Sequence, residues 1–119
     1  MFEFLPESHD DILGIKMSGK LTDDDYQKVL IPKMKQLMKA HGKLKVLLQF
    51  EDFDGWELKA GWDDAVFGIA HRKDFKKLAL VGGPAYVEWS MNLFAPFMTG
   101  EIRHFPAQGL TAAWAWIRE

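Results

Sequence analysis

The sequence predicts an α/β domain with a mixed, mainly parallel, five-stranded sheet and about four helices. Two observations lead to this class. Short apolar runs alternate with segments of helical periodicity in the order β-β-α-β-α-β-α-β-α, and such alternation is typical of parallel sheets. The chain has 119 residues, of which 48% are hydrophobic. This length and composition suit one core, so residues 1–119 are expected to form a single domain.

The first two strands are expected to pair as an antiparallel hairpin, which makes the sheet mixed. Phe2–Leu5 and Ile12–Met17 are apolar stretches, and Ser8–Asp11 between them supplies turn-forming residues. In the second stretch, every second residue belongs to one clearly apolar face, which is the period of a strand. Gly19 is expected to end this strand.

The first helix is expected to begin at Thr22 and to stop at Gly42. Thr22 is a suitable N-cap, and the charges of Asp23–Asp25 suit the positive end of the helix dipole. Apolar residues then recur at helical spacing, but Pro32 lies inside the pattern. Because proline removes an amide donor and clashes with the preceding turn, we expect a kink or break near Leu30.

An acidic and aromatic segment follows the third predicted strand, Lys43–Phe50. We interpret it as a loop at the carboxyl end of a buried strand, where open α/β sheets place their ligand sites. Six carboxylates lie between Glu51 and Asp64, and hard cations prefer oxygen ligands. Their spacing matches no calcium-binding loop, however, and Gly55 is not where an EF-hand needs it. We therefore interpret these acids as caps and dipole partners of the next helix, and we expect no metal.

The remaining elements alternate along the rest of the chain. Their ends coincide with glycine or proline, which interrupt regular structure. The expected elements are a helix over Leu58–Lys73, a strand over Lys77–Val81, a helix with Pro84 at its first position that fails at Pro96, a strand over Glu101–Phe105 and a final helix that opens at Pro106.

Composition excludes several classes of function. The formal charge of −2 argues against a nucleic-acid binder, which needs a basic surface. The chain has no cysteine, so disulfides, thiolate metal sites and a cysteine nucleophile are excluded. The N-terminus lacks the pattern of a signal peptide, and no segment approaches the roughly 20 apolar residues that span a bilayer. We therefore expect a cytoplasmic protein that does not span a membrane.

Residues that carry a family resemblance run through nearly the whole chain. They are Gly19–Thr22, Phe53–Trp56, Trp62–Asp64, Phe67–Gly68, His71, Asp74–Phe75, Val81–Gly82, Trp89, Glu101–Arg103, Phe105–Pro106 and Ala115–Ile117. In this order and spacing the sequence resembles the SpoIIAA-like family of STAS-related domains. The resemblance implies a small β-α superhelix with helices mainly on one side of the sheet. It also implies kinship with anti-sigma-factor antagonists and, more remotely, with lipid-binding CRAL-TRIO domains.

One part of the family's function does not carry over. Sporulation-type antagonists present a phosphorylatable serine at the start of the helix that follows the third strand. Residues 51–64 of this chain contain no serine, threonine or tyrosine. A phosphorylation switch at that position is therefore chemically impossible, and the regulatory role of the classical antagonists is not transferred.

Aromatic residues after the strand ends are the remaining candidates for a site. Trp56, Trp62, Trp89 and Phe97 belong either to the core or to an apolar pocket or partner surface between the second and third helices, with Asp54 and His71 at its margin. The leading interpretation is a non-enzymatic binding or regulatory module without a cofactor. It would bind a protein partner or a small apolar ligand such as a lipid.

Two alternatives use the same residues. In the first, the apolar surface closes a homodimer, because twofold pairing is the commonest oligomeric arrangement. In the second, the protein is a small-molecule hydrolase or isomerase that uses Asp54 and His71, which would require the two side chains to lie within hydrogen-bond reach. His71 is too far along its helix to pair directly with Asp63, since the two are separated by roughly 12 Å of helix rise or more.

Overall fold

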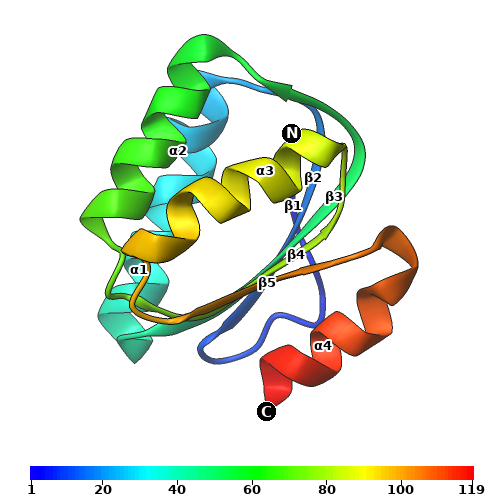
Figure 1. The fold of residues 1–119 in the computed structure, drawn as a ribbon. Helices are drawn as coiled ribbons and strands as arrows, with labels where there is room; N and C mark the ends of the chain where they lie inside the picture. The colour runs from blue at the N-terminus through cyan, green and yellow to red at the C-terminus, as the bar shows by residue number, and fades with distance from the viewer.

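The computed structural model describes residues 1–119, and its elements follow the predicted order (Figure 1). The strands are β1 (Phe2–Phe4), β2 (Ile12–Leu21), β3 (Leu44–Trp56), β4 (Phe75–Gly82) and β5 (Glu101–Phe105). The helices are α1 (Ile31–His41), α2 (Leu58–Ala70), α3 (Ala85–Phe94) and α4 (Leu110–Arg118). Three short helical turns accompany them: the π-helical η1 (Asp25–Leu30) and the 3-10 turns η2 (Ala95–Phe97) and η3 (Ala107–Gly109). None of the helices combines the length and apolar character needed to cross a bilayer.

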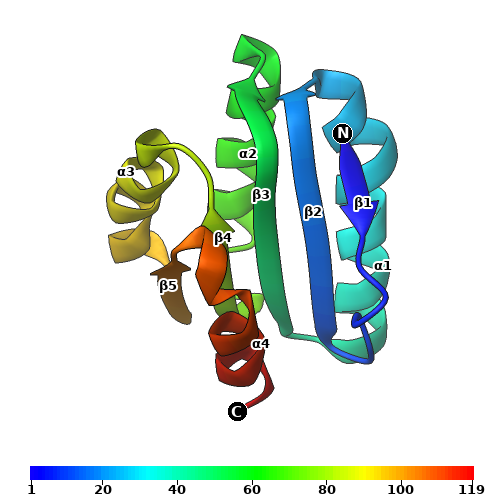
Figure 2. The same ribbon diagram turned by 90° about the vertical axis from the view of Figure 1, so that its right-hand side faces the viewer.

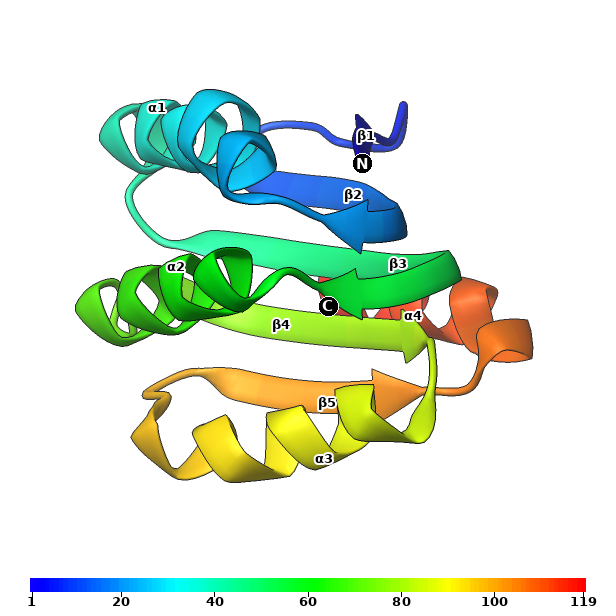
Figure 3. The same cartoon turned by 90° about the horizontal axis from the view of Figure 1, so that it is seen from above.

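The strands form one sheet in the order β1-β2-β3-β4-β5 (Figure 3). β1 is antiparallel to β2, and the other pairs are parallel, which confirms the mixed sheet. Helices α1, α2 and α3 cover one face, whereas α4 lies on the other (Figures 1 and 2). Three of the four helices therefore lie on one side, as the resemblance implies.

The period of β2 divides the core between the two faces. Leu13, Ile15 and Met17 belong to the larger core under α1 to α3. On the other face, Gly14 provides the space for Trp114 of α4, because a Cβ atom at Gly14 would lie 2.6 Å from Trp114 Cη2. The smaller core on this face consists of Leu47, Ala79, Val81, Ala113, Trp114, Trp116 and Ile117.

Two predicted strand ends are wrong, because β2 and β3 continue past them. β2 runs beyond Gly19 to Leu21, and β3 runs beyond Phe50 to Trp56, with Leu21 paired to Trp56. The register shifts on both sides of Gly19, which has φ +64°, and Asp52 has φ +50°. Such residues allow a bulge, after which pairing resumes. The acidic segment is therefore an extension of β3 and not a loop, and its aromatic residues Phe53 and Trp56 belong to the sheet.

The first helix begins as predicted and changes form before the proline. Thr22 and Asp25 cap it reciprocally: Thr22 Oγ1 accepts from the Asp25 amide at 3.1 Å, and Asp25 Oδ2 accepts from the Thr22 amide at 2.9 Å. The π-helical turn η1 ends at Leu30, and Pro32 lies in the first turn of α1. Leu30 and Ile31 both keep right-handed helical angles, so no break interrupts the helix there. The π-helical hydrogen bonding of η1 instead changes to α-helical bonding just before Pro32, which has no amide to donate.

Candidate functional site

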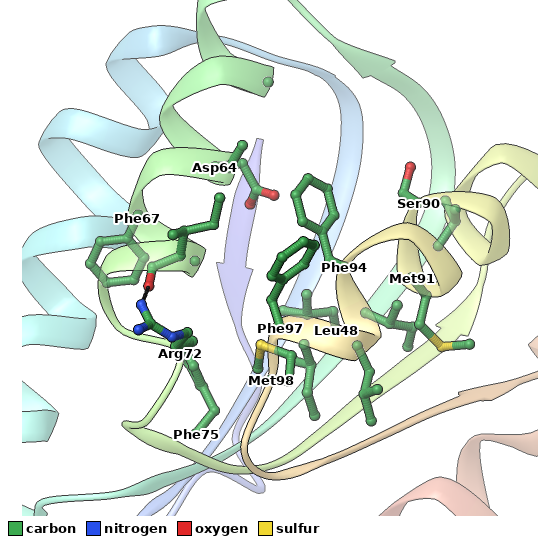
Figure 4. Close-up of a pocket in the computed structure, with 18 of the residues that line it drawn as sticks. Leu48, Asp64, Phe67, Arg72, Phe75, Ser90, Met91, Phe94, Phe97 and Met98 are labelled. Carbon is green, nitrogen blue, oxygen red and sulfur yellow. Dashed lines mark hydrogen bonds between the residues drawn. The ribbon is translucent and has the colours of Figure 1, made fainter.

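A cavity of about 280 Å³ lies between α2, α3 and the sheet face that they cover (Figure 4). Of its 23 lining residues, 18 are hydrophobic. The sheet contributes Met17, Leu48, Phe50, Trp56, Phe75, Leu78, Leu80 and Ile102. Apolar lining with few polar groups is typical of small-molecule sites, and the volume is at the small end of their range.

The inner face of α2 explains why the space is empty. Gly61, Asp64, Ala65 and Gly68 recur at helical spacing along this face, and three of them have at most one side-chain carbon. A Cβ atom built at Gly68 would have no neighbour within 4 Å. The helix therefore cannot fill the volume between itself and the sheet.

The opposite wall of the cavity comes from α3 and η2. Its side chains are Val87, Ser90, Met91, Phe94 and Phe97, and Met98 directly follows η2. Methionine side chains are flexible and adapt to irregular shapes. This wall can therefore fit apolar occupants of somewhat different outline.

Three side chains form a hydrogen-bond chain that ends at the cavity. Trp56 Nε1 donates to Tyr26 Oη at 2.7 Å, and Tyr26 Oη donates to Asp64 Oδ1 at 3.0 Å. An indole nitrogen only donates, so it occupies an acceptor position of the hydroxyl and leaves its proton for Asp64. Tyr26 is only 1% exposed, and burial raises its pKa, so the hydroxyl stays protonated. We call this arrangement the Tyr26 chain.

Asp64 is the single acid among the lining residues. Its carboxyl group points into the space between α2 and α3, toward Phe94 (Figure 4). Burial raises its pKa to about 6, and the hydrogen bond from Tyr26 opposes this rise. The residue is nevertheless exposed to solvent, so its desolvation is partial. Asp64 is thus an acid poised near neutral pH at the wall of an apolar space.

A second pair of acids attaches α2 to the turn before η1. Asp23 Oδ1 and Asp63 Oδ2 are shielded from water and receive no hydrogen bond from a donor group. The interaction between the two carboxyl side chains lowers the pKa of Asp23 and raises that of Asp63. Lys59 Nζ lies 3.3 Å from Asp23 Oδ2 and offsets the remaining charge.

The interpretation of the acids as helix caps is therefore wrong. Glu57 occupies the N-cap position of α2, but its side chain makes no capping hydrogen bond, and the first turn contains no acid. Asp63 and Asp64 instead bind residues that precede or belong to η1. The reason is tertiary, because η1 packs beside α2 and offers closer partners than the helix end.

A family model described as SpoIIAA-like matches residues 12–118. The chain belongs to the SpoIIAA-like family. This match confirms the resemblance predicted from the sequence. A search of curated proteins gave no match.

A solved structure extends the likeness of this SpoIIAA-like protein to the whole fold. It is the crystal structure of an uncharacterised protein of the DUF3478 family, with a SpoIIAA-like fold, from Shewanella loihica PV-4. The TM-score is 0.78 at 28% sequence identity, and the alignment covers 98% of this chain and 92% of the other. The predicted fold class is confirmed.

Six residues of this protein were predicted from the sequence to form a binding site, and two of them, Trp56 and Phe97, line the cavity. Trp62 and Trp89 point outward instead, with 70% and 65% of their surfaces exposed. Asp54 is also exposed. Of the four predicted aromatic residues, Trp56 and Phe97 therefore reach the cavity, although Phe97 is also 59% exposed, and Trp62 and Trp89 do not.

The sixth residue, His71, follows the last turn of α2. Its Nδ1 atom lies 2.8 Å from Asp74 Oδ2, and its ring lies 4.5 Å from the ring of Phe67. Asp54 precedes α2, so the 13 residues of that helix, about 20 Å long, separate the two side chains. Neither lines the cavity, and the hydrolase or isomerase alternative therefore lacks the contact that it requires.

Proposed function

We propose that this SpoIIAA-like domain is a non-enzymatic binding module that holds a small apolar ligand between α2 and α3. The observation that carries the proposal is the cavity itself, which has an apolar floor of strand residues and an empty volume under the small residues of α2. At roughly 30 Å³ per water-sized volume, 280 Å³ suits a ligand of about nine or ten heavy atoms. Removal of apolar surface from water drives such binding at roughly 25 cal/mol per Å² before association costs.

Filling the cavity is expected to prevent binding. Ala65 lines the cavity on α2, and Ala65→Phe places a ring in the space that the ligand needs. We expect the affinity for 1-octanol, measured by calorimetry, to fall by about tenfold or more, which corresponds to about 1.4 kcal/mol.

Ala115→Phe is the matched control, because Ala115 is exposed on α4 on the far side of the sheet. Circular dichroism would verify that both variants remain folded. Equal octanol affinity in the two variants would contradict the location of the ligand. No binding by the unmodified protein to octanol or other nine- to ten-atom apolar probes would contradict the proposal as a whole.

Self-association is a second candidate function, because α2 and α3 carry exposed apolar side chains beside the cavity. The exposed apolar residues of these helices and η2 are Leu58, Trp62, Val66, Ile69, Tyr86, Trp89, Leu93 and Phe97. On α2 they recur at helical spacing and form one stripe. Extended apolar surface of this kind is typical of interaction sites, and a second copy of the chain offers the same surface in return.

Trp62→Glu is expected to weaken such a dimer. Trp62 is 70% exposed, so the change places a charge at the centre of the α2 stripe with little effect on folding. Sedimentation velocity over increasing concentration should show a dimer for the unmodified protein and a shift toward monomer for the variant. Lys43→Glu, which alters the charge of an exposed residue outside α2, α3 and η2, is the control. A single monomer species at every concentration would eliminate this candidate.

A further inference from the structure

We infer that the ligand carries a hydrogen-bond donor at one end, best a primary ammonium group, and that Asp64 receives it while the apolar remainder fills the cavity. This inference rests on the proposed function and names the class of ligand for the same site. It follows from the direction of the Tyr26 chain and from the free hydrogen-bonding positions inside the cavity.

The Tyr26 chain determines what Asp64 offers to a ligand. Its Oδ1 atom accepts the proton of Tyr26, and no protein donor reaches Oδ2. Asp64 also has no cationic partner within 4.0 Å, since it takes part in none of the ion pairs of the protein. Asp64 is exposed to solvent, so water solvates its open oxygen in the free protein. A ligand that fills the cavity displaces this water, and a carboxylate in the apolar surrounding that results is stabilised by a donor or cation on the ligand.

The other polar groups of the lining agree with this assignment. Ser90 Oγ donates to the Tyr86 carbonyl at 2.8 Å, so its proton is used and only acceptor positions remain. Arg72 is the one cationic lining residue, and its Nη1 atom already donates to the Ile69 carbonyl at 3.0 Å. The inner polar atoms therefore accept, and a ligand that meets them must donate.

Arg72 does not favour an anionic ligand inside the cavity. It lies in the turn after the end of α2, whereas Asp64 lies in the middle of that helix, and the Arg72 side chain is exposed. Water and salt screen an exposed charge, whereas an anion beside Asp64 would meet a like charge in an apolar surrounding. An anionic head group would therefore be tolerated only beside Arg72 at the solvent-facing rim of the cavity, whereas a head group that donates a hydrogen bond fits beside Asp64.

The titration of Asp64 makes this preference depend on pH. Its pKa of about 6 leaves the carboxyl ionised above neutral pH and protonated in mild acid. The titratable and charged groups nearest to it are Tyr26 from η1, Asp63 from α2 and Arg72 from the turn after α2, whereas α3 lines the cavity with Met91 and Phe94. An alkylammonium ion should therefore bind more weakly as the pH falls from 7.5 to 5.

A series of octyl compounds tests the inference. Octylamine, 1-octanol and octanoate have nearly the same apolar chain and differ in the head group, and each would be titrated by calorimetry below its aggregation concentration at pH 7.5. We expect octylamine to bind about tenfold more tightly than octanol, and octanoate to bind most weakly. In Asp64→Asn the advantage of the amine over the alcohol should shrink to twofold or less.

The outcomes separate the inference from the proposed function. Octanoate binding as tightly as octylamine, or an amine preference that persists in Asp64→Asn, would overturn the inference and leave the cavity as an apolar site. No binding of any of the three compounds would overturn both. If Asp64→Asn does not fold, the pH series on the unmodified protein decides, because an amine affinity that is constant from pH 5 to 7.5 would refute the role of Asp64.

Discussion

Trp114→Ala is expected to lower the free energy of unfolding by about 3–5 kcal/mol, the usual range for the loss of a buried aromatic residue. Trp114 is only 5% exposed and lies in the core between α4 and the sheet. Its ring approaches the backbone of β2 at Gly14, so its removal opens a cavity along the sheet. Urea denaturation followed by circular dichroism measures the loss.

The control for this prediction is Trp89→Ala, which makes the same chemical change at an exposed position. A loss of less than about 1 kcal/mol is expected there. Similar losses in the two variants would contradict the packing of α4 against β2.

A double-mutant cycle tests the contact between Trp114 and Gly14. Gly14→Ala should be destabilising in the unmodified protein, since its Cβ would lie 2.6 Å from the Trp114 ring. It should cost less in the Trp114→Ala background, where the space is free. Additive effects would show that the two positions are independent.

Tyr26→Phe is expected to lower the free energy of unfolding by about 1–3 kcal/mol, because it leaves the Trp56 nitrogen without its acceptor. It should also raise the pKa of Asp64 above about 6, since the Tyr26 hydrogen bond is the influence that opposes the effect of burial. Carbon-detected NMR titration of the Asp64 carboxyl measures the second effect directly.

The two effects of Tyr26→Phe differ in their dependence on pH. The pKa of Asp64 in the folded protein lies above its usual value of 3.8, so ionisation of this carboxyl group lowers the stability of the fold. A further rise of the pKa in Tyr26→Phe increases this loss of stability. Below about pH 5 the carboxyl is mostly protonated in both proteins, and only the loss at Trp56 remains. The destabilisation should therefore grow as the pH rises from 5 to 8.

Tyr86→Phe is the matched control for Tyr26→Phe, because Tyr86 is 40% exposed and its hydroxyl makes no hydrogen bond with the protein. It should change neither stability by more than about 0.5 kcal/mol nor the pKa of Asp64. An unchanged pKa of Asp64 in Tyr26→Phe would contradict the Tyr26 chain.

The repeat of apolar residues every two positions in strands, and every three to four positions in helices, was sufficient to predict the order of the strands and helices. The period of Ile12–Met17 and the spacing in α4 depend on neighbouring residues alone, and both were predicted correctly. The ends of β2 and β3 were not, because Gly19 and Asp52 resemble strand breakers in the sequence. Only the partner strand shows that pairing resumes after the bulge.

The residues of the candidate site also divide into those that the sequence predicted and those that it did not. Trp56 and Phe97 were predicted from their places after strand ends, and they line the cavity. The contact of Tyr26 with Asp64 spans 38 residues and had no local signal. The small residues Gly61, Ala65 and Gly68 offered a signal that was missed, because their spacing marks a helix face that leaves space beneath it.

The sequence by itself determined the order of strands and helices, the SpoIIAA-like family and the absence of a phosphorylatable residue between Glu51 and Asp64. Those features follow from side-chain identity and short-range periodicity. The tertiary structure alone decided that Trp62 and Trp89 face outward and that an empty space remains beside Asp64. The physical reason is that exposure and cavity volume depend on how separate elements pack together, and no local pattern records the distance between them.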